Sequence, residues 1–140
     1  MSGPAVEREV AVAVFACRRS GYLAMRELTA EGLPPGIRSL LVELPCGCAI
    51  DERMVLRALE RGADAVLALV CYERSCQSLV GNVSVEKRIG VARRVLEEIG
   101  LSGRPVELRQ VSAASAARCR EALEEIAGAV RAARQGGSEQ

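Results

Sequence analysis

Four short apolar runs alternate with four helical stretches along the chain, and this alternation restricts the fold more than any other feature of the sequence. When strands and helices alternate in this way, right-handed crossovers favour a parallel sheet. We therefore predict the α/β class, with a flavodoxin-like open four-stranded parallel sheet and helices on both faces. The two most apolar runs should lie inside, which gives the strand order 2-1-3-4. The predicted strands cover residues 10–15, 39–44, 65–70 and 106–111.

Helical patterns fill the intervals after these runs, starting with a short segment over 22–29. Asp51 is placed to cap the next helix, and Gly62 to end it. The last helix is expected over 113–134, with Ser112 or Ser115 as its cap. Apolar residues recur at four- and three-residue spacing in the last two helices, as in amphipathic helices. These stripes are Val85, Ile89, Ala92, Leu96 and Ile99, followed by Gly100, and then Ala116, Cys119, Leu123, Ile126 and Val130.

Length and composition indicate one globular domain. The chain has 140 residues, of which 49% are hydrophobic and 26% charged, so it can bury a core without disulfides. We predict a single domain over 1–140 with flexible tails at 1–8 and 135–140. The net charge of +1 and the three aromatic residues give no basis for binding nucleic acid. Because we find neither a signal-peptide core nor a membrane-spanning apolar segment, we expect a cytoplasmic protein without membrane insertion.

Most of the cysteines follow the predicted strands. Cys17, Cys46 and Cys71 each come directly or closely after one of the first three apolar runs. Because the carboxyl ends of parallel strands lie along one edge of an open sheet, we expect these thiols to meet at that edge. Cys76 adds a fourth thiol on the loop after Cys71. Cys48, two residues after Cys46, is an alternative ligand.

The residue types point to sulfur chemistry. The chain contains no histidine, so a metal held by its side chains would most naturally be held by sulfur. A set of thiolates suits an iron–sulfur cluster or a tetrahedral zinc ion. Two other interpretations stay open at this point. In the first, the thiols are small buried hydrophobic groups. In the second, they form a thiol–disulfide switch through the pair Cys46 and Cys48 or the pair Cys71 and Cys76.

Other chemistry has little support in the sequence. Cys119 falls on the apolar stripe of the last helix, so we assign it to the core. Without histidine, neither a Cys–His nor a Ser–His dyad can form, and no dinucleotide-binding glycine motif follows the first run. We predict no catalytic residue and no independent catalysis. Most of the arginines at 18, 19, 53, 57, 61 and 74 are expected to be solvated, with a minority forming a cationic rim near the thiols that guides an acidic partner.

Several short segments, in a fixed order and spacing, carry a family resemblance. They are Val14-Phe15-Ala16-Cys17 with Tyr22; Cys46 with Asp51, Val55, Leu56 and Ala58; Gly62-Ala63-Asp64-Ala65-Val66-Leu67; Cys71 with Cys76; Gly81-Asn82 with Arg88; Leu96-Glu97-Glu98-Ile99-Gly100-Leu101; and Val111-Ser112-Ala113-Ala114. Over about residues 10–130 the chain resembles the delta (iron–sulfur) subunit family of methyl-viologen-reducing hydrogenase. Three features depart from the family pattern. Ser20 replaces the second cysteine after the first strand, Cys48 is an extra thiol, and Tyr72-Glu-Arg-Ser75 replaces the usual histidine and proline-glycine residues.

The resemblance implies a function. It implies a [2Fe–2S] cluster held by Cys17, Cys46, Cys71 and Cys76, and a role as an electron relay in an anaerobic bifurcating or confurcating oxidoreductase complex. The implied partners are a hydrogenase or formate dehydrogenase-type module and a flavin-containing heterodisulfide-reductase A-like subunit. The alternative is a structural zinc or thiol-redox scaffold protein of the same kind of complex.

Overall fold

The computed structural model describes residues 9–45, 49–70, 81–101 and 103–137, and gives the backbone alone for 81–85 and 136–137. Strands and helices alternate throughout this part of the chain, as the sequence predicts. The elements are β1 Val10–Cys17, α1 Gly21–Glu31, β2 Ile37–Leu44, α2 Glu52–Glu60, β3 Ala65–Val70, α3 Gly81–Glu98, β4 Val106–Gln110 and α4 Ala116–Gly137.

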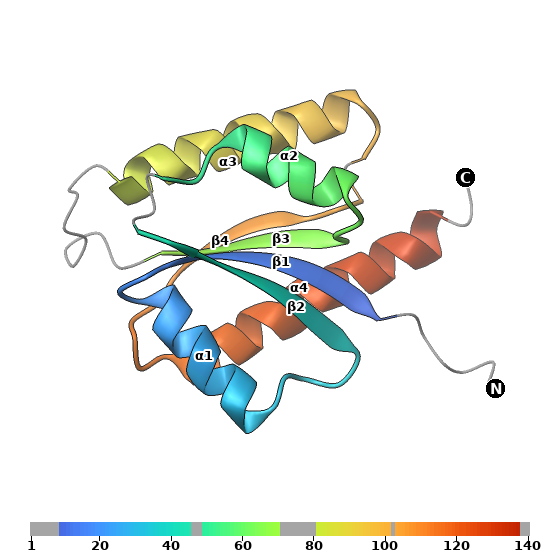
Figure 1. Ribbon diagram of the computed structural model, residues 1–140. Coiled ribbons are helices and arrows are strands. Elements are labelled where there is room, and N and C mark those ends of the chain that lie inside the picture. The colour runs from blue at the N-terminus through green and yellow to red at the C-terminus, as the bar shows by residue number, and fades with distance from the viewer. Residues whose placement is uncertain (1–8, 46–48, 71–80, 102, 138–140) are drawn as a thin grey trace.

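The four strands form one parallel sheet in the order β2-β1-β3-β4, which confirms the predicted fold class and strand order (Figure 1). Every residue of β1 and β3, the two central strands, is buried. Strands buried on both faces read as continuous apolar runs, which is the pattern that these two segments show. β2 and β4 lie at the edges, where β2 carries exposed residues and β4 carries mostly half-buried ones.

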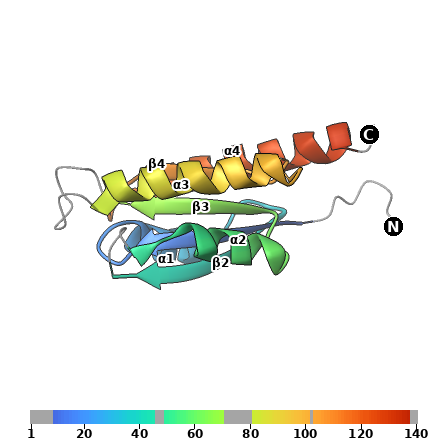
Figure 2. The ribbon, with the colours of Figure 1, turned by 90° about the horizontal axis from the view of Figure 1, so that it is seen from above.

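Helices cover both faces of the sheet. α1 and α4 pack together on one face, and α2 and α3 pack together on the other (Figures 1 and 2). Side chains of β1 alternate between the two cores because successive residues of a strand point to opposite faces. Val12 and Val14 join the core under α1 and α4, whereas Ala13 and Phe15 join the core under α2 and α3.

The last helix confirms its predicted stripe and differs from prediction at its ends. Ala116, Cys119, Leu123, Ile126 and Val130 are all buried. The helix starts three residues later than expected and continues to residue 137, past the predicted end at 134. No helix in the described part of the chain is long and apolar enough to cross a membrane.

One predicted core residue is exposed. α3 ends at Glu98, and Ile99 follows it with 59% of its surface accessible. The stripe prediction was therefore wrong at Ile99, because helical periodicity does not apply beyond the end of the helix. Ile89, Ala92 and Leu96, which lie within α3, are buried as predicted.

At the amino edge of the sheet, polar contacts join the start of β1 to the residue before β3 and to the last turns of α4. Asp64, just before β3, accepts a hydrogen bond from the backbone amide of Ala11 at 2.9 Å. The same carboxylate pairs with Arg134 of α4 at 3.1 Å. Arg134 also donates to the carbonyl oxygen of Glu9 at 3.2 Å. These contacts fix the beginning of β1 and the last turns of α4 side by side.

Candidate metal centre

Cys17 is the last residue of β1, and it is 4% exposed. It lies opposite Leu44, the last residue of β2, and the amide of Arg18 donates to the Leu44 carbonyl oxygen at 2.7 Å. On the other side of β1, Ala16 lies opposite Leu69, one residue before the end of β3. The three strands therefore end at the same edge, which we call the carboxyl edge.

The other four predicted site residues are Cys46, Cys48, Cys71 and Cys76, and all lie outside the described residues. Cys46 is two residues past the end of β2, and Cys71 directly follows β3 in the sequence. The structure thus brings together the strand ends that precede them, while the ligand set stays a prediction. Within the described residues, no group of three side chains capable of holding a metal ion occurs.

Ser20 adds a buried hydroxyl close to Cys17 in the chain. It precedes α1 at the N-cap position, where serine usually accepts a hydrogen bond from the first turn, but its side chain makes no such bond. Its amide donates to the Cys17 carbonyl oxygen at 3.1 Å, which closes a tight turn. Ser20 is 3% exposed, and among the described residues its Oγ atom has no hydrogen-bond partner. A buried hydroxyl of this kind is suited to donate to a thiolate or another anion.

Gly21 sets how closely α1 approaches the sheet at this edge. A β-carbon at this position would lie 2.5 Å from the Leu69 Cβ atom and 2.7 Å from its carbonyl oxygen. These distances are too short for any residue but glycine without movement of the backbone. The turn from Cys17 to Gly21 is therefore held against β3, the strand that precedes Cys71.

Arg88 fixes the chain on the other face of the sheet. Its guanidinium group donates to the carbonyl oxygen of Ile50 at 2.6 Å, and Ile50 is 1% exposed. Asp51 caps α2 as predicted, accepting a hydrogen bond from the amide of Met54 at 2.9 Å. The sequence pointed to Arg88 through the family resemblance alone, because its contact with Ile50 spans 38 residues and leaves no local pattern.

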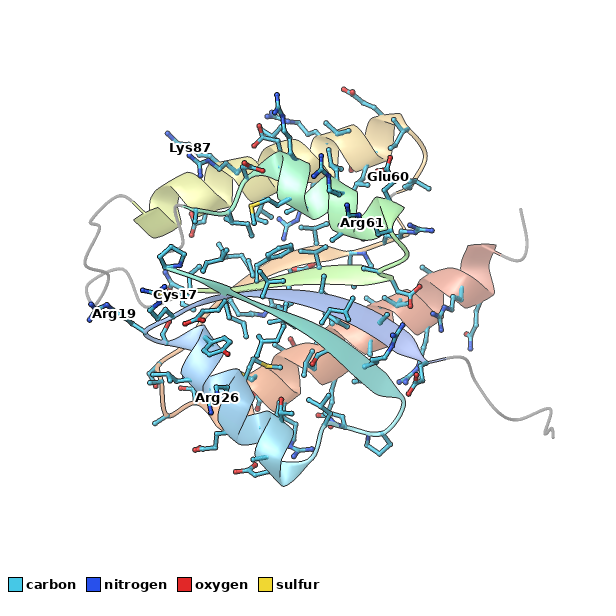
Figure 3. The ribbon with its side chains drawn as sticks, in the orientation of Figure 1. Cys17, Arg19, Arg26, Glu60, Arg61 and Lys87 are labelled. Atoms are coloured by element: carbon cyan, nitrogen blue, oxygen red, sulfur yellow. The ribbon has the colours of Figure 1, made fainter. Side chains whose placement is uncertain are left out.

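The arginines do not form one rim near the thiols. Arg19 lies near Cys17 at the carboxyl edge (Figure 3). Arg18, the residue after Cys17, pairs with Glu43 at 3.3 Å in an exposed ion pair. Arg61 lies far from Cys17 (Figure 3), and Arg57 and Arg61 line a groove on the side of α2. α2 begins at Glu52 and rises about 1.5 Å per residue, so Arg57 in its last turn and Arg61 just past its end lie away from this edge. Arg74 lies outside the described residues.

Cys119 belongs to the core, as predicted. It is fully buried among the side chains under α1 and α4. Burial raises the pKa of its thiol from 9.0 to about 11, because the charged thiolate is poorly solvated there. A thiol that holds its proton in this way is a poor metal ligand and a poor nucleophile.

These features define a class of protein: a doubly wound α/β domain with a buried thiol at the end of its first strand and with further cysteines following the neighbouring strands in sequence. A family model described as methyl-viologen-reducing hydrogenase, delta subunit, matches residues 12–133. The chain therefore belongs to the family of methyl-viologen-reducing hydrogenase delta subunits.

Curated relatives agree with this assignment. The chain is 31% identical to the vhu iron-sulfur subunit of F420-non-reducing hydrogenase from Methanocaldococcus jannaschii, over 82% of this chain and 86% of the relative. It is 30% identical to the protein of the same name in Methanococcus maripaludis, over 84% and 88% of the two chains. It is also 31% identical to part of the A subunit of ferredoxin:CoB-CoM heterodisulfide reductase from Methanosarcina mazei, where the match covers 82% of this chain and 14% of that protein.

Proposed function

We propose that this chain is an iron–sulfur electron-transfer subunit whose [2Fe–2S] cluster is held by Cys17, Cys46, Cys71 and Cys76. The observation that carries the proposal is the common carboxyl edge at which β1, β2 and β3 end. Two curated relatives named as iron-sulfur subunits support the choice of iron over zinc. Zinc sites also usually contain closely spaced cysteine pairs, and Cys17 and Cys46 lack such a partner at the usual spacing.

The described residues fit such a cluster in three ways. Cys17 offers a thiol at the end of a central strand, where the backbone is held by its neighbours on both sides. The low exposure of Cys17 and Ser20 limits the access of water to this position. The Oγ atom of Ser20, which has no hydrogen-bond partner among the residues that the structure describes, supplies a donor, and such donors tune iron–sulfur centres. When bound, the cluster would accept and release single electrons.

The proposed partners are taken from the names of related chains. One set of relatives consists of hydrogenase subunits, and another relative is the A subunit of a heterodisulfide reductase, which contains a matching segment. We propose that this chain relays electrons between a hydrogenase or formate dehydrogenase-type module and a flavin-containing heterodisulfide-reductase A-like subunit. In that setting it would be cytoplasmic, would take part in flavin-based electron bifurcation or confurcation, and would need no catalytic residue of its own.

Chemical analysis of the protein purified without oxygen tests the cluster. A [2Fe–2S] centre requires about two irons and two sulfides per chain, and the reduced protein should give the electron paramagnetic resonance signal of one unpaired electron. Colourless protein that contains stoichiometric zinc would contradict the proposal and support the scaffold alternative.

Single substitutions test the ligands. Cys17→Ser, Cys46→Ser, Cys71→Ser and Cys76→Ser should each abolish or distort the visible absorption of the cluster. Cys119→Ser is the matched control and should retain that absorption, because Cys119 is fully buried in the core. Cys48→Ser tests the alternative ligand. Loss of the cluster in Cys119→Ser, together with its retention in Cys71→Ser, would show that the ligand assignment is wrong.

A further inference from the structure

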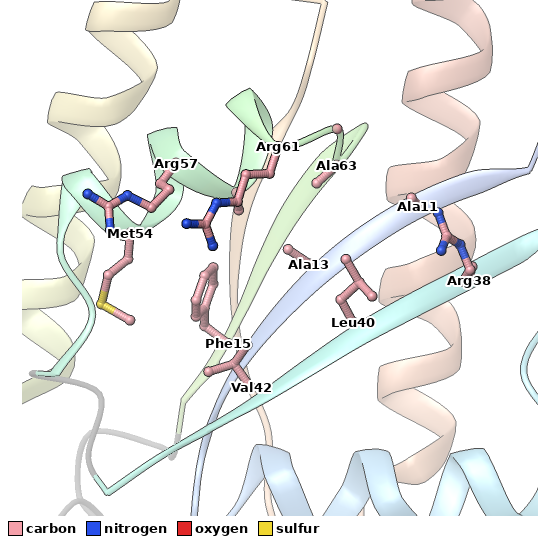
Figure 4. Close-up of a pocket in the computed structure, with 12 residues that line it drawn as sticks. Ala11, Ala13, Phe15, Arg38, Leu40, Val42, Met54, Arg57, Arg61 and Ala63 are labelled. Carbon is pink, nitrogen blue, oxygen red and sulfur yellow. The ribbon is translucent and has the colours of Figure 1, made fainter.

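A groove of about 450 Å³ lies between α2 and β2, on a face of the sheet that no described helix covers completely (Figure 4). Its floor is formed by β1, which contributes two alanines and Phe15. Leu40 and Val42 of β2 form one wall and are 47% and 38% exposed. Met54 and Ala58 of α2 form the other wall.

The groove exists because the helices are unevenly placed over the sheet. On this face α2 packs mainly against β3 and α3, whereas the main helix contacts of β2 are with α1 on the opposite face. The small side chains of Ala11 and Ala13 leave space above β1 that a larger residue would fill. Leu40 and Val42 consequently present apolar surface to solvent, while the other face of the strand is partly covered by α1.

Three arginines surround this apolar surface. Arg38 comes from β2, and Arg57 and Arg61 come from α2 (Figure 4). All three are exposed, and none of them has a carboxylate partner within the described residues. Elsewhere on the molecule arginines do pair, as Arg93 does with Glu107 at 3.2 Å. The groove therefore combines an apolar floor with positive charge on both sides.

We propose that this groove docks an amphipathic α-helix of a partner subunit, with its apolar face toward Leu40 and Phe15 and with carboxylates on its flanks. A helix fits because helices pack 8–10 Å apart, so one placed beside α2 would cover β2 and complete the layer. From Arg38 to Val42 the strand extends roughly 13 Å, which about two and a half turns of helix match. Acidic flanks would pair with Arg38, Arg57 and Arg61, which fixes the direction and register of docking.

This inference rests on the proposed function in one respect: the partner is taken to be a subunit of the proposed electron-transfer complex. The groove lies along α2 and β2, and it includes none of the predicted cluster ligands. Cluster content and groove binding can therefore be measured separately on one preparation.

Site-specific cross-linking in the anaerobically purified complex tests the proposal. A photoreactive phenylalanine analogue at position 40 should cross-link to the heterodisulfide-reductase A-like or hydrogenase-type subunit that co-purifies. The cross-linked peptide should belong to a helix with apolar residues at i, i+3 and i+4 and with acidic residues beside them. The same analogue at Leu23, which is 45% exposed on α1, is the control and should not give this product.

Charge reversal gives an independent measurement. The double variant Arg57→Glu, Arg61→Glu should retain its partner subunit at least about tenfold less well at moderate salt, whereas Arg26→Glu on α1 should not. Iron content should stay unchanged in both variants, which separates this result from a failure of the cluster proposal. Leu40→Ser is a second variant and should lose the partner subunit to the same extent. Because Leu40 is exposed, this substitution should leave the fold intact.

Three results would overturn the proposal. One is a cross-link from position 40 to a second copy of this chain, which would make the groove a self-association surface. Another is a cross-link to a basic or non-helical segment. The third is an intact complex in which neither the cross-link nor the charge reversal has any effect.

Discussion

At the scale of single residues, Gly21 is a position where the fold has no room for a side chain. Gly21→Ala would place a β-carbon 2.5 Å from Leu69, against a central strand that cannot move away. We expect a loss of about 1–3 kcal/mol in the free energy of unfolding, as for other overpacked sites. Urea denaturation of the variant and the parent measures this loss.

Gly128→Ala is the matched control for Gly21→Ala. Gly128 lies within α4, and a β-carbon there would meet nothing within 4 Å. Alanine should stabilise this helix by about 0.5–1 kcal/mol, because glycine loses more backbone entropy on folding. Equal destabilisation in both variants would show that the contact with Leu69 is not the cause.

Cys119 gives the protein a predictable response to alkaline pH. Since burial raises the pKa of its thiol to about 11, the folded state keeps this proton over a range where the unfolded chain releases it. The corresponding stabilisation is fully present below pH 9 and is lost as the pH rises through 11. The free energy of unfolding should therefore fall more steeply between pH 9 and 11 in the parent than in Cys119→Ala. Parallel curves for the two proteins in urea titrations would contradict this.

At the scale of elements, α2 depends on its capping residue. Asp51→Ala removes the hydrogen bond from the Met54 amide to the carboxylate and should cost about 1 kcal/mol of stability. Asp51→Asn should restore most of this loss, because an amide oxygen also accepts the bond. Chemical denaturation of the three proteins makes the comparison. An alanine variant as stable as the parent would show that the cap contributes nothing.

Local patterns predicted most elements and failed where the elements end. Asp51 and the stripe of α4 were predicted correctly, because caps and periodic apolar residues are short-range signals. Ile99 was misplaced because the helix stops one residue before it. Ser115 occupies the position before α4, as a cap would, but its Oγ atom accepts from the Ser112 amide at 3.2 Å. Whether Ser115 Oγ accepts from the first turn of the helix or from Ser112 depends on turn geometry that the residue types do not specify.

At the scale of the whole molecule, the two hydrophobic cores form from residues that are not predicted ligands. Removing iron with a chelator under reducing conditions should therefore leave the far-ultraviolet circular dichroism nearly unchanged. The melting temperature should fall, because a bound cluster stabilises the folded state that holds it. A chain that unfolds completely on losing iron would show that the cluster, and not the cores, maintains the fold.

The global arrangement could be predicted in part. Strand order followed from which runs were most apolar, and the convergence of Cys17 with the ends of β2 and β3 followed from parallel topology. The groove beside β2 could not be predicted, because it depends on which strand each helix covers. For the same reason the sequence did not separate Arg57 and Arg61, which line that groove, from the other arginines considered for a cationic rim near the thiols.

The contacts of Arg134 with Glu9 and Asp64 have a practical consequence. They hold the beginning of the first strand and the final turns of the last helix at the edge opposite Cys17 (Figure 3). A polypeptide tether added at either of these points would leave the edge proposed to hold the cluster facing outward. Immobilisation on an inert support through this end would therefore leave the proposed cluster edge free to meet a soluble electron donor or acceptor.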